Sequence, residues 1–276
     1  MVFSSFLITS RETLEAALVV GVVMAYLTKT NNNQYKKTVY YGIVFGVILS
    51  ILAAVAFTLL SGGFEGRAEE IFEGFTMLFA AVLLTTMILW MMKQSNIAQQ
   101  IESKVASHIA KAEYKSTYAI GLFALIMVAV LREGVETVIF FGALNYSSGI
   151  SFFGATLGII TAIGIGYLFF VGSRKINLRK FFTISSILLI LISAGLVAHG
   201  IHELQEAALI PIAAGQVWDT NSILNENGVF GSFLKGLFGY NGNPSLLEVL
   251  FYFAYLGIIF YIYHRIDKSS QIAVKS

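Results

Sequence analysis

Apolar runs long enough to cross a membrane recur along this chain and constrain its fold more than any other feature. Hydrophobic residues make up 57% of the 276 positions and charged residues only 12%, whereas a soluble domain carries about 25% charged residues. The chain has no cysteine, which excludes disulfides, thiolate metal sites and thiol catalysis. The sequence therefore predicts an all-α integral membrane protein.

The apolar runs predict seven membrane spans, because about 20 mostly apolar residues are needed to cross the hydrocarbon. A polar stretch, 93–116, is predicted to form a cytoplasmic helical hairpin. A long outer loop, 208–245, is predicted to carry short interfacial helices. We expect one membrane domain over 1–276, with spans at about 3–28, 39–60, 70–92, 117–144, 149–172, 181–207 and 246–264.

The basic residues predict how these spans are oriented. Fourteen of the 18 lysines and arginines follow the first, third, fifth and seventh spans. Such residues concentrate on the cytoplasmic side of a membrane. We therefore expect a multi-pass membrane protein with the N-terminus outside and the C-terminus inside.

Two copies of the pattern Arg-Glu-x-x-Glu lie inside predicted spans. One runs from Arg11 to Glu15 in the first span, and the other from Arg132 to Glu136 in the fourth. An ionised carboxylate within hydrocarbon costs about 2.5–3.5 kcal/mol even on the lenient insertion scale. Four such carboxylates, each pair accompanied by an arginine, therefore indicate a functional site.

The placement of the two motifs predicts an inverted repeat. The first span runs inward and the fourth runs outward, so one pattern occurs on antiparallel helices that each lead a set of three spans. This is the arrangement of inverted-repeat transporters, whose sites form where the repeats meet. At 1.5 Å per residue, both motifs lie roughly 12–14 Å below the outer surface. We therefore expect the motifs to meet, and one half to move against the other during transport.

The spacing within each motif predicts a site for a hard cation. Glu12 and Glu15 are three residues apart, as are Glu133 and Glu136, so each pair projects from one face of its helix. Carboxylate oxygens suit hard cations, whereas soft Cu(I) prefers cysteine or methionine. We expect the arginine of each motif, Arg11 and Arg132, to compensate this charge until a metal displaces the pairing. The alternative is that each arginine forms a salt bridge that joins helices.

A second constellation lies near the outer end of the sixth predicted span. His199, His202, Glu203 and Glu206 follow one another at helical spacing, and Glu73 opens the third span. Imidazole with carboxylate suits iron, zinc or manganese, or a proton relay. The alternative is a polar helix end that emerges into water. We interpret these residues as candidate metal ligands on the approach to the main site.

With both motifs placed on spans one and four, the chain resembles the high-affinity iron permease family. That family comprises fungal oxidase-coupled permeases and bacterial iron-uptake permeases. The resemblance extends to Glu73-Gly74 and to an outer-loop series: Trp218-Asp219-Thr220, Gly231, Leu237, Gly239-Tyr240 and Pro244-Ser245. Thr13 stands where the family often has glycine, which bears on close helix packing at that position.

The resemblance implies uptake of iron across the cytoplasmic membrane, usually as Fe(III) after oxidation by a partner enzyme. The family's motif carboxylates correspond to Glu12, Glu15, Glu133 and Glu136. We expect iron as a transported substrate rather than a permanently bound cofactor. We expect a separate ferroxidase or extracytoplasmic iron-binding protein as partner, and no nucleic acid. The alternatives are a permease for manganese or lead and, outside the transporters, a membrane di-metal oxidase.

Overall fold

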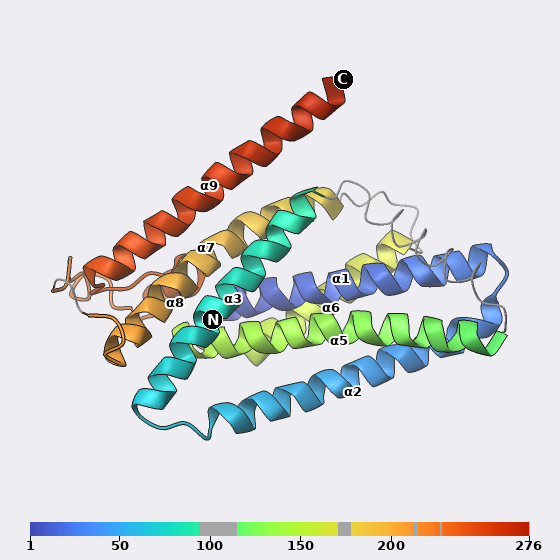
Figure 1. Cartoon of the computed structure of the whole chain (residues 1–276), viewed down its shortest axis with the longest axis horizontal. Helices are drawn as coiled ribbons and strands as arrows, with labels where there is room; N and C mark the ends of the chain where they lie inside the picture. The colour runs from blue at the N-terminus through green and yellow to red at the C-terminus, as the bar shows by residue number, and fades with distance from the viewer. Residues whose placement is uncertain (94–114, 171–177, 212–214, 227, 276) are drawn as a thin grey trace.

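The computed structural model describes residues 1–93, 115–170, 178–211, 215–226 and 228–275. Regular structure in these ranges is helical (Figure 1), apart from one isolated bridge between Gln216 and Ser245. Residues 94–114 of the predicted cytoplasmic hairpin lie outside them. The elements are α1 (Val2–Lys29), η1 (Asn33–Tyr35), α2 (Lys36–Ser61), α3 (Arg67–Lys93), α5 (Lys115–Ser147), α6 (Phe152–Phe170), α7 (Leu178–Glu206), α8 (Val229–Phe238) and α9 (Leu246–Lys275).

Six helical segments within the described residues are long and apolar enough to cross a membrane, which makes the chain a multi-pass membrane protein. α1 has 28 residues but carries the charges of Arg11, Glu12 and Glu15, so it is not one of the six. The seventh span and the orientation therefore stay predictions. The six segments are Asn33–Ser61, Arg67–Met91, Tyr118–Ser147, Phe152–Phe170, Lys180–Glu206 and Leu246–Arg265.

Four helices form a layer in the order α6, α1, α5, α2. α6 packs on α1, α1 packs on α5, and α5 packs on α2. α1 and α5 run in opposite directions (Figure 1). The two helices that carry the Arg-Glu-x-x-Glu motifs are therefore the inner pair of the layer.

Glycines allow close packing within the two outer pairs of this layer. Gly154 and Gly158 of α6 lie against α1, where an added Cβ would meet the backbone of that helix. Gly42 and Gly46 of α2 lie against α5 in the same manner. Small residues four positions apart let membrane helices approach closely. α2 and α6, the second and fifth predicted spans, thus each use glycines to pack closely on a helix that carries a motif. This is the pattern that an inverted repeat would give.

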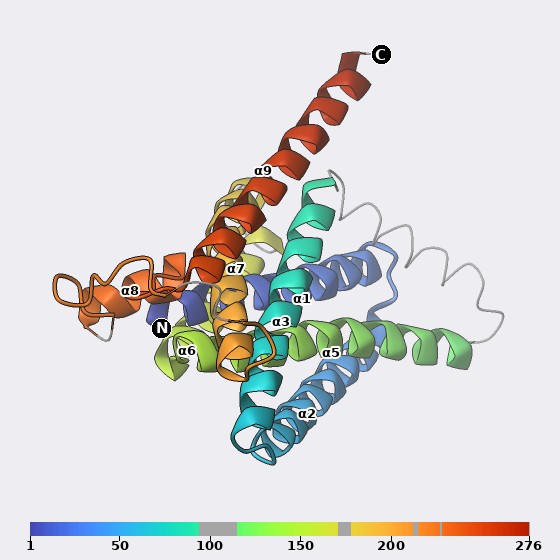
Figure 2. The ribbon, with the colours of Figure 1, turned by 60° about the vertical axis from the view of Figure 1, so that its left-hand side comes forward.

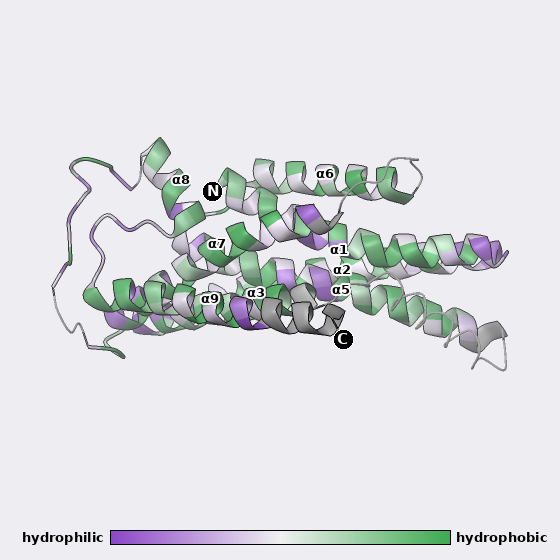
Figure 3. Cartoon of the chain, turned by 90° about the horizontal axis from the view of Figure 1, so that it is seen from above, coloured by the Kyte–Doolittle hydropathy of each residue, from purple (hydrophilic) through white to green (hydrophobic). Residues whose placement is uncertain are grey.

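α3 and α7 pack on each other and cross the layer (Figure 2). Gly74 of α3 lies against the backbone of Gly200 of α7. α8 and α9 both pack on α7, and α9 diverges from the other helices along its length (Figures 1 and 2). The ribbons of the long helices are coloured mainly as hydrophobic (Figure 3), and many of their large hydrophobic side chains are exposed, as contact with the hydrocarbon of a bilayer requires.

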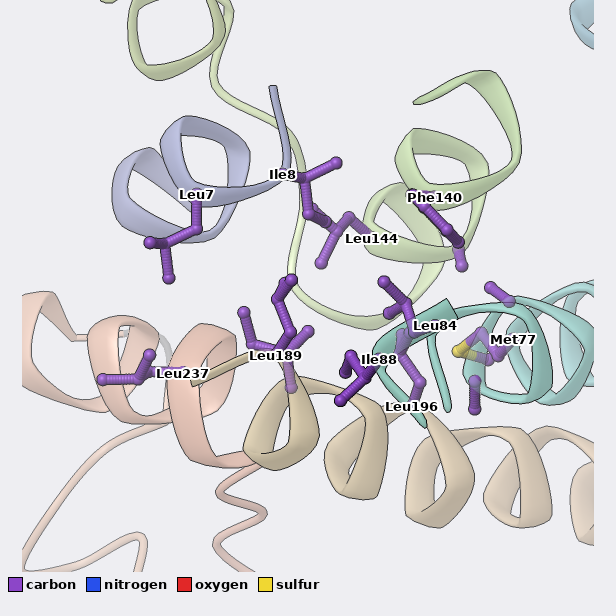
Figure 4. Packing of buried hydrophobic residues seen from close by; sticks show 14 residues of the cluster. Leu7, Ile8, Met77, Leu84, Ile88, Phe140, Leu144, Leu189, Leu196 and Leu237 are labelled. Atoms are coloured by element: carbon purple, nitrogen blue, oxygen red, sulfur yellow. The ribbon is translucent and has the colours of Figure 1, made fainter. Parts of the chain in front are cut away.

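Two hydrophobic clusters fill the interior, one on each side of the motifs. The first joins α1, α3, α5, α7 and α8 (Figure 4), and the second joins α1, α2 and α5. Along α1 the motif lies between Ile8 of the first cluster and Val23 of the second; along α5 it lies between Val130 of the second and Phe140 of the first. The charged residues therefore occupy a polar layer between two apolar ones.

The segment predicted to form the outer loop, 208–245, contains α8, a short helix whose first residues Val229 and Phe230 are exposed. α8 ends at Gly239, which adopts a left-handed conformation with φ of 67°. Gly239 lies directly against Gly195 of α7, where a Cβ on either residue would overlap the other's backbone. This contact fixes the end of α8 on the bundle.

Candidate metal centre

Three glutamates from the two motifs converge where α1 and α5 meet. One carboxylate oxygen from each of Glu12, Glu133 and Glu136 lies within 4.8 Å of the others. Glu12 and Glu133 are buried, and Glu136 is partly buried. Oxygen ligands at these separations can bind a single hard cation between them. Antiparallel packing of α1 and α5 thus assembles a possible site from residues 121 or more positions apart.

Glu15, the fourth motif carboxylate, is joined to this group through Arg11. Nη2 of Arg11 lies 3.3 Å from Oε1 of Glu15, and Nη1 lies 3.4 Å from Oε1 of Glu12. The side chain of Arg11 is fully buried. One guanidinium thus lies between both carboxylates of its own motif.

Arg132 occupies the corresponding position on α5 with different surroundings. Its Nε lies 2.8 Å from Oε1 of Glu136 and 3.9 Å from Oε1 of Glu133. Its side chain is 53% exposed, whereas that of Arg11 is 0% exposed. The structure therefore has both arginine–glutamate pairs at four-residue spacing, one enclosed by protein and the other open on one side.

Several buried polar atoms of the site have no hydrogen-bond partner. Among the described residues these include Oε2 of Glu12, Oε2 of Glu133 and Nε of Arg11. A buried unsatisfied polar atom costs about 1–3 kcal/mol, and more when it is charged. With all groups ionised, four carboxylates and two guanidiniums carry a formal charge of −2. The arrangement thus offers free oxygen atoms and negative charge to a cation.

The span-six residues make different contacts from those of the motifs. Nδ1 of His199 lies 2.9 Å from the carbonyl oxygen of Gly195. His202 lies between two carboxylates: its Nδ1 is 3.0 Å from Oε1 of Glu248, and its Nε2 is 3.3 Å from Oε1 of Glu206. The three-glutamate group contains no histidine. His202 is thus bound into a contact between α7 and α9.

Glu73 lies near the N-terminal end of α3, and Glu203 lies near the C-terminal end of α7. The charge of Glu203 acts on Glu73, as do those of Glu69 and Glu70. The candidates from two different spans are therefore close enough to influence each other electrostatically. In the described part of the chain they do not form a compact ligand group of the kind found at the motifs.

Comparison with known proteins identifies the family of the chain. The model of the iron permease FTR1 family matches residues 2–266.

The chain belongs to the iron permease FTR1 family.

Curated relatives of this FTR1-family chain are similar over nearly their whole length. The ferrous iron permease EfeU of Escherichia coli O6:H1 (strain CFT073) is 34% identical over 257 residues, which cover 92% of each chain. The ferrous iron permease EfeU of Yersinia pestis is 33% identical over 277 residues, covering 98% of this chain and 97% of the relative. No solved structure matches the chain. The family predicted from the two motifs is thereby confirmed.

Sequence reasoning missed two sets of contacts in this FTR1-family chain. The guanidinium of Arg11 donates hydrogen bonds to Sδ of Met87 at 2.8 Å and to Sδ of Met91 at 2.9 Å. The signal was present, because residues four apart on α3 share one face of the helix. Uncharged thioethers in an apolar span, however, do not stand out from its other side chains.

The second set surrounds Glu248 in the first turn of α9. Its Oε1 accepts a hydrogen bond from the backbone N–H of Ser245, while its own N–H donates to Oγ of Ser245. Its Oε2 accepts a hydrogen bond from Nδ2 of Asn241. The Ser-x-x-Glu pattern before an apolar run is the sequence signature of such a capping box. Glu248 therefore holds His202 and caps a helix at once.

Proposed function

We propose that this chain is an iron-uptake permease that binds its ion between α1 and α5. Glu12, Glu133 and Glu136 are the main ligands, and Glu15 becomes one when Arg11 moves. The observation that supports this most strongly is the convergence of three carboxylates within 4.8 Å on antiparallel helices. The buried, unpartnered oxygens of Glu12 and Glu133 add to it, since structural salt bridges alone would leave that cost uncompensated.

Iron is in this proposal a substrate that replaces arginine as the counter-charge of the site. Arg11 and Arg132 hold the carboxylates while no ion is bound. An incoming cation attracts the same oxygen atoms more strongly because it carries more charge at shorter distance. Release of the arginines then couples ion binding to a change in helix contacts. Proton binding by the emptied carboxylates would supply a driving force.

The cation is proposed to arrive as Fe(III) from a separate ferroxidase or extracytoplasmic iron-binding protein. Ligands that are all oxygen favour this hard ion. A second candidate is direct uptake of Fe(II). The relatives named above are called ferrous iron permeases.

The approach to the site is proposed to lie on the outer side of the cytoplasmic membrane. Glu73 and Glu203 interact at the outer ends of α3 and α7, and Glu206 accompanies His202 nearby. Negative charge at such a mouth raises the local cation concentration. These residues therefore serve as an attractive entrance, and the motif carboxylates as the binding site.

Uptake of radioactive iron into proteoliposomes tests the proposal. Fe(II) kept reduced with ascorbate and Fe(III) supplied as citrate are compared, with a pH gradient of either sign. Glu15→Ala and Glu136→Ala should each abolish uptake while the protein still inserts. Glu65→Ala, which removes an exposed carboxylate between α2 and α3, is the matched control and should transport normally. Normal uptake by both motif variants would overturn the site.

The same vesicles separate the alternatives. Manganese or lead that competes with iron at equal concentration would indicate a permease of broader range. Oxygen-dependent turnover of iron by the purified protein without vesicles would instead indicate a di-metal oxidase. We expect iron to be preferred and no such turnover.

A further inference from the structure

The guanidinium of Arg11 lies among four atoms that can each bind a metal. Two are the carboxylate oxygens of Glu12 and Glu15, at 3.4 and 3.3 Å from Nη1 and Nη2. The other two are the thioether sulfurs of Met87 and Met91, at 2.8 and 2.9 Å from the same two nitrogens. Oxygen ligands come from α1 and sulfur ligands from α3. The position between these four atoms is thus already occupied by a cation, the guanidinium of Arg11.

The thioethers distinguish this position from the three-glutamate group. Sulfur ligands of cysteine or methionine select soft cations such as Cu(I), whereas carboxylates alone select hard ones. The chain has no cysteine, so methionine is its only source of soft ligands. Met87 is 5% exposed and Arg11 is fully buried, so water competes little for the place.

We propose that Met87 and Met91, with Glu12 and Glu15, form a binding site for a soft monovalent cation of the Cu(I) or Ag(I) class in the place of the Arg11 guanidinium. At the ligand atoms one monovalent cation replaces another, so their local charge balance is unchanged. The guanidinium stays in the chain and moves aside with its own charge, so the protein as a whole gains one positive charge. No oxidation or reduction is involved. Two atoms at this place lack a hydrogen-bond partner, Nε of Arg11 and Oε2 of Glu12. The guanidinium therefore leaves hydrogen-bonding groups at this position without partners, which favours its replacement by another cation.

A soft cation at this site would inhibit iron transport. Glu12 and Glu15 belong to both sites, so an ion held by them and by the two sulfurs removes two of the four carboxylates from iron. This second step rests on the proposed function, whereas binding of the soft cation does not. The two claims can therefore fail separately.

Binding is tested with Ag(I) and the purified full chain in a chloride-free nitrate buffer. Equilibrium dialysis gives the affinity, and X-ray absorption at the silver edge reports sulfur neighbours. The double variant Met87→Leu/Met91→Leu keeps the volume of the side chains and removes both sulfurs. Met77→Leu is the matched control, because Met77 is equally buried on α3 but belongs to the apolar cluster. We expect the double variant to bind Ag(I) at least tenfold more weakly, and the control to bind as the wild type does.

Equal affinity of the wild type and the double variant would overturn the proposal. If the double variant does not fold, the absorption spectrum of the wild type still decides: absence of sulfur neighbours around bound silver would refute the site. Arg11→Ala adds a third measurement. Removal of the competing guanidinium should tighten Ag(I) binding at least tenfold, and no change would show that the arginine does not occupy the site.

Inhibition is tested in proteoliposomes. Ag(I) should block iron uptake by the Met77→Leu variant as it does in the wild type. If silver binds through sulfur but leaves uptake unchanged, the soft site stands and the shared role of Glu12 and Glu15 in iron transport is refuted. If neither silver binding nor iron uptake depends on these residues, both proposals fail.

Discussion

The two Arg-Glu-x-x-Glu motifs share a pattern but differ in their surroundings. On α1 the arginine is fully buried and contacts two methionines of α3 as well as its own glutamates. On α5 the arginine contacts its glutamates while half of its side chain stays exposed. Identical local geometry thus gives unequal environments, because tertiary neighbours decide burial.

A second difference concerns the residue that follows the first glutamate. In α5 it is Gly134, where an added Cβ would overlap the side chain of Ser50 on α2. In α1 it is Thr13, which is partly buried. On that side the close contacts use glycines of the partner helix, such as Gly158 of α6 against Thr9. Close packing of α1 on α6 thus relies on small residues of α6.

The largest effect should come from the glutamates that the two motifs contribute to one group. Glu12→Gln and Glu133→Gln remove one charge each without changing volume. If the motifs form a single site, each variant should reduce iron uptake by at least about 100-fold, the upper end of the loss seen for residues that only support a ligand. Uptake into proteoliposomes at equal protein insertion measures this. Full activity in one variant alone would mean that the motifs work separately.

The arginines should differ in their contribution to stability. Arg11→Ala leaves Glu12 and Glu15 buried without a counter-charge, which should cost about 3–5 kcal/mol in the free energy of unfolding. Arg132→Ala removes a half-exposed partner and should cost about 1 kcal/mol. Thermal unfolding of the two variants in the same detergent compares them. Equal losses of unfolding free energy in the two variants would show that the difference in burial of the two arginines does not affect stability.

Packing at the two motifs is compared by Gly134→Ala. The added methyl group meets Oγ and Cβ of Ser50, and such overpacking costs about 1–3 kcal/mol. Combining it with Ser50→Gly removes the obstacle, so the double variant should recover much of the lost stability. A double variant that is no better than the single one would locate the strain elsewhere.

Thr13→Gly makes the α1 motif match the α5 motif and should have the smallest effect. The helix propensities of threonine and glycine differ by less than about 0.5 kcal/mol. Iron uptake and melting temperature should both stay close to those of the wild type. A large loss would reveal a role for the threonine hydroxyl that its partly buried position does not suggest.

Much of the architecture follows from the sequence, because the membrane imposes simple rules. Apolar runs indicated the spans, and six of the helices have the length and composition to cross a bilayer. The spacing of the motifs and the expected antiparallel helices indicated that their carboxylates would meet, and Glu12, Glu133 and Glu136 do lie together.

The remaining contacts depend on which helices pack together, and the sequence does not record this. The span-six residues were expected to act as one cluster. In the structure His202 also reaches Glu248, a residue 46 positions away, and no spacing rule predicts that contact. The contact of Arg11 with Met87 and Met91 depends likewise on how α3 crosses α1. Thioethers carry no charge and follow the apolar pattern of their span, so periodicity does not separate them from ordinary core residues.

The way in which helices of the two sequence halves pack on each other has a consequence for how the protein can move. Each helix of the first three packs mainly on a helix of the second three: α1 on α6, α2 on α5, and α3 on α7. The two sequence halves are therefore interleaved and cannot separate as rigid bodies. We expect the moving units to be the glycine-packed pairs α1–α6 and α2–α5. The sliding surface then runs between α1 and α5, so such a motion would also change the distance between the carboxylates that we propose as ligands of the ion.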